Sequence, residues 1–445
     1  MLKIDVTTQN KGQQSLIIKL ALLAFAGLLF LIPLKMIESV ITERQLNGEK
    51  VKQDISKQWA ERQNISGPVL NIPVKTIPVK TDEKPVTSVW HIMPETLSVN
   101  GKVDPEIRNR GIYQSVVYNS DIQISGEFVL PKTSSLNDHE ILWDKAYYTV
   151  GISDNRGLKG DIFLNTGNVN LEAEPGVIDQ DIFKTGISFR CPVKDSLKKI
   201  NFKMAFKLSG SESLLVSPIG KTTKVHMVSA WRSPAFSGSF LPIRRTVDDN
   251  GFLADWEVTH MNRNFPQEWV GSAYHTEDSS FGFELFIPVD HYQKSWRSVR
   301  YGILFIALTF LVLIFLEITR KETIHIFNYI LVSFGLVLFF SLLTSLSEHI
   351  GFNFSYLISS SATVGLITVF TRSLLKNKKA VLILSGMLTV LYLFIFILLS
   401  MDDYAFLAGN IGLFILLTVI MWQAGRIDLF RNETAREISP EDRSE

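Results

Sequence analysis

The sequence predicts a membrane protein in which an α-helical transmembrane bundle of six spans carries a large external domain rich in β-strands. Six segments are apolar for long enough to cross a bilayer, and a long stretch between the first two alternates apolar with polar residues. Lys and Arg also gather in alternate loops. We expect the external sheets to be antiparallel, and we leave open whether they form duplicated sandwich-like units.

The first apolar segment, residues 15–35, contains the run SLIIKLALLAFAGLLFLIPL. A span needs about 20 apolar residues to cross roughly 30 Å of hydrocarbon, and this run meets that length. It is longer than the apolar core of a signal peptide, and no small-residue cleavage site follows it. We therefore expect an uncleaved anchor. The other spans form a five-helix bundle over residues 300–424, at 301–318, 326–346, 354–375, 380–400 and 404–423.

The charges between the spans predict the orientation, because Lys and Arg favour the cytoplasmic side. Four segments carry these cations: the N-terminal tail (1–14), the loops after the second and fourth spans, and the C-terminal tail (425–445). The two intervening turns contain neither Lys nor Arg. Both termini are thus expected in the cytoplasm and residues 36–299 outside. In a bacterium with two membranes, that places residues 36–299 in the periplasm.

The external segment begins with a predicted membrane-proximal helix over about 37–60, where Val51, Ile55 and Trp59 recur at a spacing of four. From residue 68 the pattern of apolar and polar residues changes to one that is typical of strands. Alternation at period two marks residues 69–80, 113–130 and 199–210. Turn residues separate such runs at Asn100-Gly101, at 154–157 and at Asn250-Gly251.

A short motif recurs within the external segment. SGEFVLP at 125–131 is similar to SGSFLP at 237–242, and SGPVL at 66–70 is a poorer third copy. Each places a glycine before a short apolar run. A duplication would produce this pattern, but glycine and proline also punctuate unrelated strands.

The composition excludes several classes of function. With 45 Lys+Arg against 44 Asp+Glu, the chain lacks the cation excess that nucleic-acid binding needs. The single cysteine, Cys191, allows no internal disulfide. The external histidines show no metal-ligand spacing, and no nucleotide or hydrolase motif is present, so we expect no cofactor, no metal and no enzymatic activity. A zinc site assembled from distant histidines stays open as the alternative. These histidines are His91, His139, His226, His260, His275 and His291.

The cores of the spans carry no charge, whereas ion-coupled transporters usually place an ionisable group there. The fourth span contains a polar cluster, Ser359 to Ser361 with Thr363. Small residues of this kind most simply allow helices to pack closely. They could also line a pathway, so a transporter or lipid-handling function stays open as the alternative.

One pair of features lies at the predicted outer membrane interface. The connector before the second span carries Lys294, Arg297 and Arg300, and the turn after the third span carries Glu348 and His349. Their matched depth and opposite charge lead us to expect that this turn contacts the connector and couples the external domain to the bundle.

Several stretches, taken in order, make the chain similar to the CreD family of bacterial inner-membrane proteins. They are GISDNRGLKG (151–160), SGSFLPIRR (237–245), GFLADWEVTHMNRNFP (251–266), FIPVDHYQKSWRSVRYGILF (286–305) and SLSEHIGFNFSYLIS (345–359). The resemblance spans the external domain and the bundle. It implies an inner-membrane protein linked to cell envelope integrity, envelope stress and toxin tolerance, and it supplies no catalytic residues.

We therefore expect a non-enzymatic envelope-integrity factor that acts through its external domain. The expected partners are membrane lipids and an envelope protein that the sequence does not identify, and nucleic acid is not among them. A third hypothesis is a periplasmic enzyme whose site is assembled from scattered residues such as Asp154, Arg156 and His260.

Overall fold

The computed structural model describes residues 6–77, 86–136, 138–167, 169–193, 198–285, 287, 291–320, 323–375, 377–401 and 404–424. The chain divides into two compact units. One is helical and contains residues 1–44 and 291–445, and the other contains residues 45–290 and the strands. The predicted C-terminal tail (425–445) and the first five residues of the N-terminal tail lie outside the described residues.

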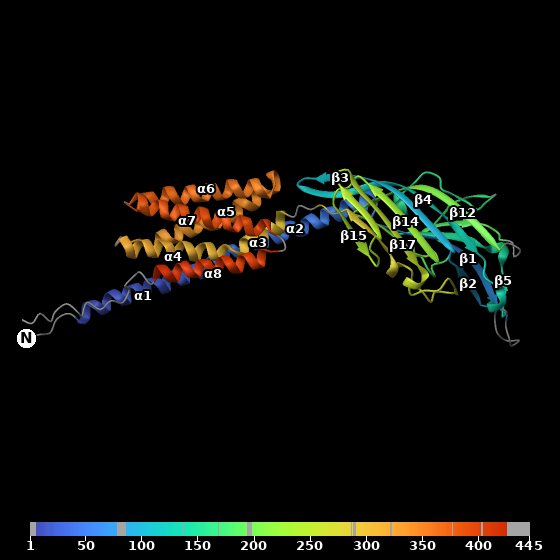
Figure 1. The fold of residues 1–445 in the computed structure, drawn as a ribbon, viewed down its shortest axis with the longest axis horizontal. Coiled ribbons are helices and arrows are strands. Elements are labelled where there is room, and N and C mark those ends of the chain that lie inside the picture. Colours follow the sequence, from blue (N-terminus) through green and yellow to red (C-terminus); the bar gives the residue numbers. More distant parts are fainter. Residues whose placement is uncertain are drawn as a thin grey trace, which may run out of the picture. The chain divides into compact units, whose positions relative to one another are not determined.

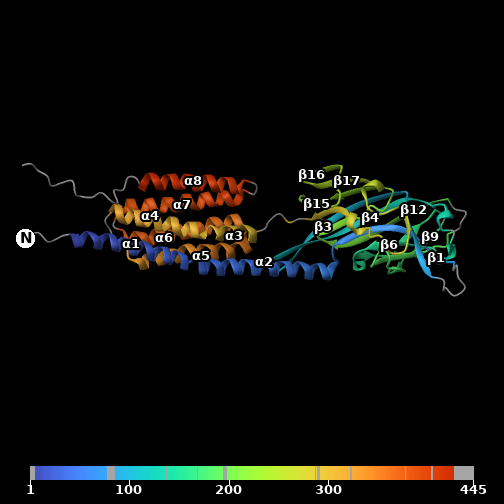
Figure 2. The same cartoon turned by 90° about the horizontal axis from the view of Figure 1, so that it is seen from below.

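Long helices make up the helical unit, and Figures 1 and 2 show α4 to α8 aligned side by side. The first part of helix α2, up to Arg44, also belongs to this unit. The helices are α1 (Val6–Leu29), α2 (Leu31–Trp59), α3 (His291–Arg300), α4 (Gly302–Arg320), α5 (Ile326–Ile350), α6 (Phe352–Leu374), α7 (Lys378–Ser400) and α8 (Ala405–Ala424).

Helix α1 begins nine residues before the predicted span, so part of the expected N-terminal tail is helical. The boundary between α1 and α2 falls at Phe30. Pro33 explains this break, because its ring removes a backbone N–H and meets the carbonyl of Leu29 four residues earlier. Helix α2 then covers the predicted membrane-proximal helix.

Five helical segments among the described residues are long and apolar enough to cross a membrane: 18–59, 291–319, 326–350, 352–374 and 378–400. These correspond to the first five predicted spans. The sixth predicted span, 404–423, coincides with helix α8, which is not one of the five. A six-span topology therefore stays a prediction.

Two large sheets build the β unit. Sheet A contains β1 (Gln63–Thr76), β2 (Thr87–Ile92), β5 (His139–Ile141), β6 (Tyr147–Ile152), β10 (Glu174–Pro175), β11 (Gly186–Arg190), β13 (Ser213–Val216), β15 (Pro234–Gly238), β18 (Glu268–Val270) and β19 (Phe281–Leu285). Sheet B contains β3 (Thr96–Arg110), β4 (Tyr113–Val129), β7 (Leu158–Lys159), β8 (Phe163–Asn165), β9 (Asn170–Glu172), β12 (Lys199–Ser211), β14 (Thr222–Ser229), β16 (Arg244–Asp248) and β17 (Gly251–Thr259).

The prediction of purely antiparallel sheets is wrong. Strand β1 pairs with β13 in parallel, and β3 pairs with β14 in parallel, so both sheets are mixed. Alternation along a strand reports which face is buried, but it carries no information on the direction of the neighbouring strand. Each parallel pair joins segments more than one hundred residues apart, which local sequence patterns cannot reveal.

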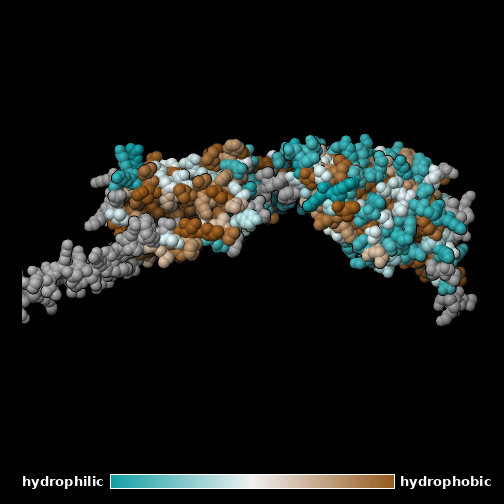
Figure 3. Space-filling model, viewed as in Figure 1, coloured by the Kyte–Doolittle hydropathy of each residue, from teal (hydrophilic) through white to brown (hydrophobic). Residues whose placement is uncertain are grey.

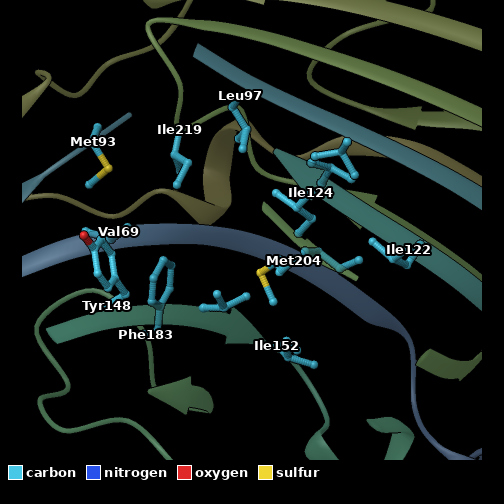
Figure 4. Packing of buried hydrophobic residues seen from close by; sticks show 14 of the residues in the cluster. Val69, Met93, Leu97, Ile122, Ile124, Tyr148, Ile152, Phe183, Met204 and Ile219 are labelled. Atoms are coloured by element: carbon cyan, nitrogen blue, oxygen red, sulfur yellow. The ribbon is translucent and has the colours of Figure 1, made fainter. Parts of the chain in front are cut away.

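A continuous hydrophobic core occupies the β unit and draws on both sheets. Figure 4 shows Val69 and Tyr148 of sheet A in the same cluster as Ile124 and Met204 of sheet B. Strand β12 alternates between buried and exposed residues, as expected for a sheet with one wet face. Strand β6 is instead buried at every position, so the centre of sheet A is covered on both faces.

Two glycines lie inside regular secondary structure, where glycine is usually unfavourable. Gly48 lies inside helix α2, where the ring of Tyr113 packs so closely that an added Cβ would lie 3.1 Å from it. The predicted turn at Asn100-Gly101 is wrong, because both residues lie within β3. Strand β14 pairs there, and Met227 fills the space that a side chain at Gly101 would need.

The order of the strands does not support a tandem duplication. The series β1, β3, β4, β6 and the series β13, β14, β17, β19 both run from sheet A to sheet B and back. Strands β6 and β4 of the first series lie on one side of the parallel pairs β1–β13 and β3–β14. Strands β19 and β17 of the second series lie on the other side. The two series are thus related as mirror images, and no rotation superposes such arrangements. The repeated SG motifs lie in β1, β4 and β15, which are not equivalent strands.

The surface follows the same division into units. Figure 3 shows mainly apolar residues over the long helices and mixed, largely polar residues over the strands. Exposed apolar side chains are frequent on the helices, with Phe354, Leu382 and Val369 more than two-thirds exposed. A helix that is apolar on its outer side needs hydrocarbon around it, which supports membrane insertion of this unit.

Candidate functional site in the helical unit

Aromatic side chains join the central helices of the helical unit. The rings of Phe305 on α4, Phe339 on α5 and Tyr392 on α7 lie 4.6 to 6.0 Å apart between centroids. Tyr356 on α6 adds an edge contact to Phe339 at 5.4 Å. Contacts of this kind hold four helices around one point at the centre of the unit.

A groove of about 720 Å³ opens beside this aromatic cluster, between α6 and α7. Small residues on α6 leave the space, and aromatic residues on both helices wall it. Its lining consists of Asn353, Phe354, Tyr356, Leu357, Ser360, Ser361, Val364 and Gly365 from α6, with Thr389, Tyr392, Leu393 and Phe396 from α7.

The hydroxyl groups near this groove mostly serve the helices themselves. Ser360 Oγ donates to the carbonyl of Leu357 at 3.1 Å, and Thr363 Oγ1 donates to that of Ser359 at 2.8 Å. Tyr356 Oη crosses to the carbonyl of Tyr392 at 2.8 Å. These bonds occupy three of the donors, whereas Tyr392 Oη is buried without a hydrogen-bond partner. The other lining side chains are mostly apolar. An apolar chain loses less on entering it than a polar solute would.

The predicted coupling residue Glu348 lies near the C-terminal end of α5. Its Oε1 accepts a hydrogen bond from Tyr292 Oη on α3 at 3.1 Å, and its Oε2 lies 3.9 Å from Arg44 Nη1 on α2. The turn therefore contacts the connector helix, and the cation beside Glu348 is Arg44. Sequence reasoning missed Arg44 because it considered only the charges on the connector.

The other predicted coupling residues make different contacts, and His349 is exposed. Lys294 Nζ lies 6.0 Å from the ring centre of Phe352, and Arg300 stacks on Trp296 at 3.8 Å. Arg297 donates to the carbonyl of Met401 at 3.2 Å, just past α7, where helix carbonyls lack partners and a cation is favoured. Coupling of the β unit to the helices stays a prediction.

The residues suggested for a scattered enzyme site separate into two places. Asp154 and Arg156 form a close ion pair, with 2.7 Å between Oδ2 and Nη2, and Arg156 also donates to the carbonyl of Lys57 at the end of α2. Asp154 accepts the backbone N–H of Glu61. This cluster secures the entry from α2 into β1. His260 lies after β17, where its backbone N–H donates to the carbonyl of Lys221.

Together, these features define a membrane protein with a cluster of apolar helices and a large β unit of two mixed sheets. The family model described as "Inner membrane protein CreD" matches residues 15–430. The chain is also 30% identical to "Inner membrane protein CreD" of Escherichia coli (strain K12), over 95% of this chain and 97% of that protein. The chain belongs to the CreD family of inner-membrane proteins.

Solved structures show weaker similarity. An M1 zinc metallopeptidase from Deinococcus radiodurans matches with a TM-score of 0.18 and 9% identity, over 37% of this chain and 39% of that one. A putative protease from Parabacteroides distasonis matches with a TM-score of 0.21 and 11% identity, over 56% and 50%. Similarity at this level carries no argument about fold or function.

Proposed function

We propose that this protein is an envelope-integrity factor that acts without chemistry of its own, through its β unit in the periplasm. Membership of the CreD family and the resemblance described above support this role. The observation that carries the proposal is the β unit itself, whose single core draws on both sheets. A stable scaffold of this size suits the presentation of a surface to an envelope partner.

The orientation belongs to the same proposal. Both termini would be cytoplasmic and residues 36–299 periplasmic, with six spans in the inner membrane. The alternation of Lys and Arg between the loops supports this arrangement, because such cations are retained on the cytoplasmic side.

Site-specific photo-crosslinking in intact cells tests the proposed role. A crosslinker at Met261, which is 81% exposed in the β unit, should capture a defined envelope protein. The same probe at Phe354, exposed on α6, should capture lipid and serves as the matched control. Loss of detergent and toxin tolerance on deletion of the gene, restored by the full chain, should accompany the crosslink. A purified protein that turns over a substrate as a hydrolase or transferase would refute the non-enzymatic role.

A second candidate function is the handling of lipids or other amphiphiles, and the groove between α6 and α7 favours it. Its volume of about 720 Å³ suits part of an acyl chain, and its wall is mainly apolar.

Filling the groove tests this second function. Ser361→Trp should remove co-purifying lipid, measured by mass spectrometry after purification in detergent. Val369→Trp, which places the same large side chain at an exposed position of the same helix, should retain it. Equal lipid content in both variants would argue that the groove is only a gap between helices.

A further inference from the structure

A row of side chains crosses sheet A on the face that does not meet sheet B. Asn71 of β1 pairs directly with His91 of β2 on one side and with Tyr147 of β6 on the other. His91 in turn pairs with Trp269 of β18. Directly paired residues on neighbouring strands point to the same face, so these four side chains lie together. His91 is completely buried there.

Asn71 determines which nitrogen of His91 carries the proton. The amide nitrogen of Asn71 donates to Thr149 Oγ1 at 2.9 Å, so its Oδ1 is the atom that faces the imidazole. His91 Nδ1 lies 2.7 Å from that Oδ1 and must donate to it. Nε2 of a neutral ring then keeps a free lone pair on the opposite side. A second hydrogen-bonded group that orients a histidine in this way is a regular feature of metal ligands.

A loop brings two carboxylates to this lone pair. The segment 177–185 packs on sheet A because Gly151 has no side chain, which leaves room for the ring of Phe183. Thr185 Oγ1 donates to the carbonyl of Ile152 at 2.7 Å and fixes the end of the segment. Asp179 and Asp181, two residues apart, both point back toward His91.

Asp179 is itself held in place. One carboxylate oxygen accepts the backbone N–H of Asp181 at 3.0 Å, and the other accepts the hydroxyl of Tyr147. Each carboxylate oxygen has two lone-pair directions, so both can still bind a cation. Both aspartates are half-buried, which leaves the outer side of the cluster open to water.

The distances match those of ligands around one ion. His91 Nε2 lies 3.4 Å from Asp181 Oδ2, and the ligand atoms of all three residues lie within 4.8 Å of one another. Two ligands at about 2.1 Å from a tetrahedral metal are separated by about 3.4 Å. The buried Nε2 forms no hydrogen bond. The lone pair of a neutral imidazole that faces a carboxylate is unfavourable unless a proton or a metal ion lies between the two atoms.

We propose that His91, Asp179 and Asp181 bind one divalent transition-metal ion of the Zn²⁺ or Mn²⁺ class, which fastens segment 177–185 to sheet A. One imidazole and two carboxylates suit these ions, whereas Mg²⁺ and Ca²⁺ prefer oxygen ligands alone. Water completes the coordination on the open side. The ligands come from β2 and from a loop nearly ninety residues later, so spacing along the chain does not reveal them.

Metal binding is tested on the untagged full-length protein in detergent, stripped with a chelator and reloaded with Zn²⁺, Mn²⁺, Mg²⁺ or Ca²⁺ in turn. Zn²⁺ or Mn²⁺ should bind at one ion per chain and raise the thermal midpoint, and Mg²⁺ and Ca²⁺ should not. Co²⁺ should give visible absorption bands of a site with nitrogen and oxygen ligands. Failure of Zn²⁺ and Mn²⁺ alike to bind with a stoichiometry near one would overturn the proposal.

Variants identify the ligands. Asp181→Asn and Asp179→Asn change partly exposed side chains and should fold, and each should weaken binding at least about tenfold to hundredfold. Asp255→Asn is the matched control, because Asp255 also pairs with a histidine, His226, at 2.6 Å but has Arg244 in place of a second carboxylate. It should bind metal as the wild type does. Unchanged affinity in both ligand variants would assign the bound metal to another place and refute this site.

Discussion

Two charged residues of the β unit show how single side chains hold its chain segments together. Asp154 gathers the N–H of Glu61 and the guanidinium of Arg156 where α2 gives way to the strands. Arg263 is buried and donates to backbone carbonyls of three residues, and its guanidinium lies 4.0 Å from the ring centre of Phe265. In both cases a charged side chain forms hydrogen bonds with backbone groups that have no partner within the secondary structure.

Asp154 predicts a pH-dependent contribution to stability. Its partial burial favours the neutral acid, but the hydrogen bonds from Arg156 and from the Glu61 N–H outweigh this and hold the pKa of Asp154 below its usual value. A carboxyl with a lowered pKa stabilises the fold above its unfolded pKa of about 3.9, and the stabilisation is lost as the pH falls through the folded pKa. Asp154→Asn should thus lower the thermal midpoint by a few degrees at pH 7 and by progressively less below about pH 4.

Thermal unfolding followed by circular dichroism at a series of pH values measures this effect. Asp161→Asn, at an exposed aspartate of the same unit, should match the wild type throughout. A destabilisation by Asp154→Asn that persists undiminished at pH 2.5 would show that the carboxylate charge is not its cause.

Arg263 predicts a larger and pH-independent effect near neutrality. Burial lowers the pKa of its guanidinium to about 10, so the group stays charged at pH 7. Arg263→Met would leave the carbonyls of Ile219 and Phe265 buried without a donor, at a cost of about 3 kcal/mol in the free energy of unfolding. Denaturant unfolding measures it. Arg232→Met, at an exposed position, should change stability by less than about 0.5 kcal/mol.

Pairs of elements decide how the two units are built. In the β unit, one parallel pair of strands that are distant in sequence lies in the middle of each sheet. In the helical unit, rings fill the space among α4, α5, α6 and α7, and hydroxyl groups mostly return to their own helix. The hydroxyl of Thr368 on α6 makes two contacts, because it lies 2.6 Å from the Val364 carbonyl of its own helix and 2.9 Å from Ser385 Oγ on α7.

The interhelical bond predicts a small, measurable contribution. Thr368→Val removes the hydroxyl and keeps the shape of the side chain, so the helical unit should lose about 0.6 kcal/mol. Unfolding in mixed micelles reports this change. Thr389→Val removes a hydroxyl that donates to the Ser385 carbonyl of its own helix at 2.8 Å, and it should have no effect. Equal losses of stability in the two variants would show that the interhelical bond adds nothing beyond a hydrogen bond within one helix.

At the scale of the whole molecule, two units with different surfaces share one chain. The helices expose large apolar side chains, and the β unit encloses a core of its own. One chain can satisfy both surfaces only if hydrocarbon surrounds the helices and water surrounds the strands.

Labelling of single cysteines tests the proposed orientation. The only native cysteine is replaced by Cys191→Ser, and new ones are introduced singly as Asp249→Cys in the exposed β16–β17 turn and Lys378→Cys at the exposed start of α7. A membrane-impermeant maleimide should label the first in cells with a permeable outer membrane, and the second only after the inner membrane is opened. The reverse pattern would invert the topology.

The sequence by itself determined the apolar helices, the long strands β4 and β12, and the family. These features depend on periodicity and run length, which are local and survive without knowledge of neighbours. The Asn250-Gly251 turn belongs to the same class, because it follows from the backbone preference of two residues.

Only the tertiary structure decided which distant strands pair and which distant side chains contact one another. It paired β1 with β13 and β3 with β14, kept Asn100-Gly101 inside a strand, and placed Arg44 beside Glu348 in place of the expected connector cations. It also brought His91 to Asp179 and Asp181. Each of these depends on which distant segment fills a given space, and that is settled by packing of the whole core and by the pairing of buried polar groups, which no local pattern records.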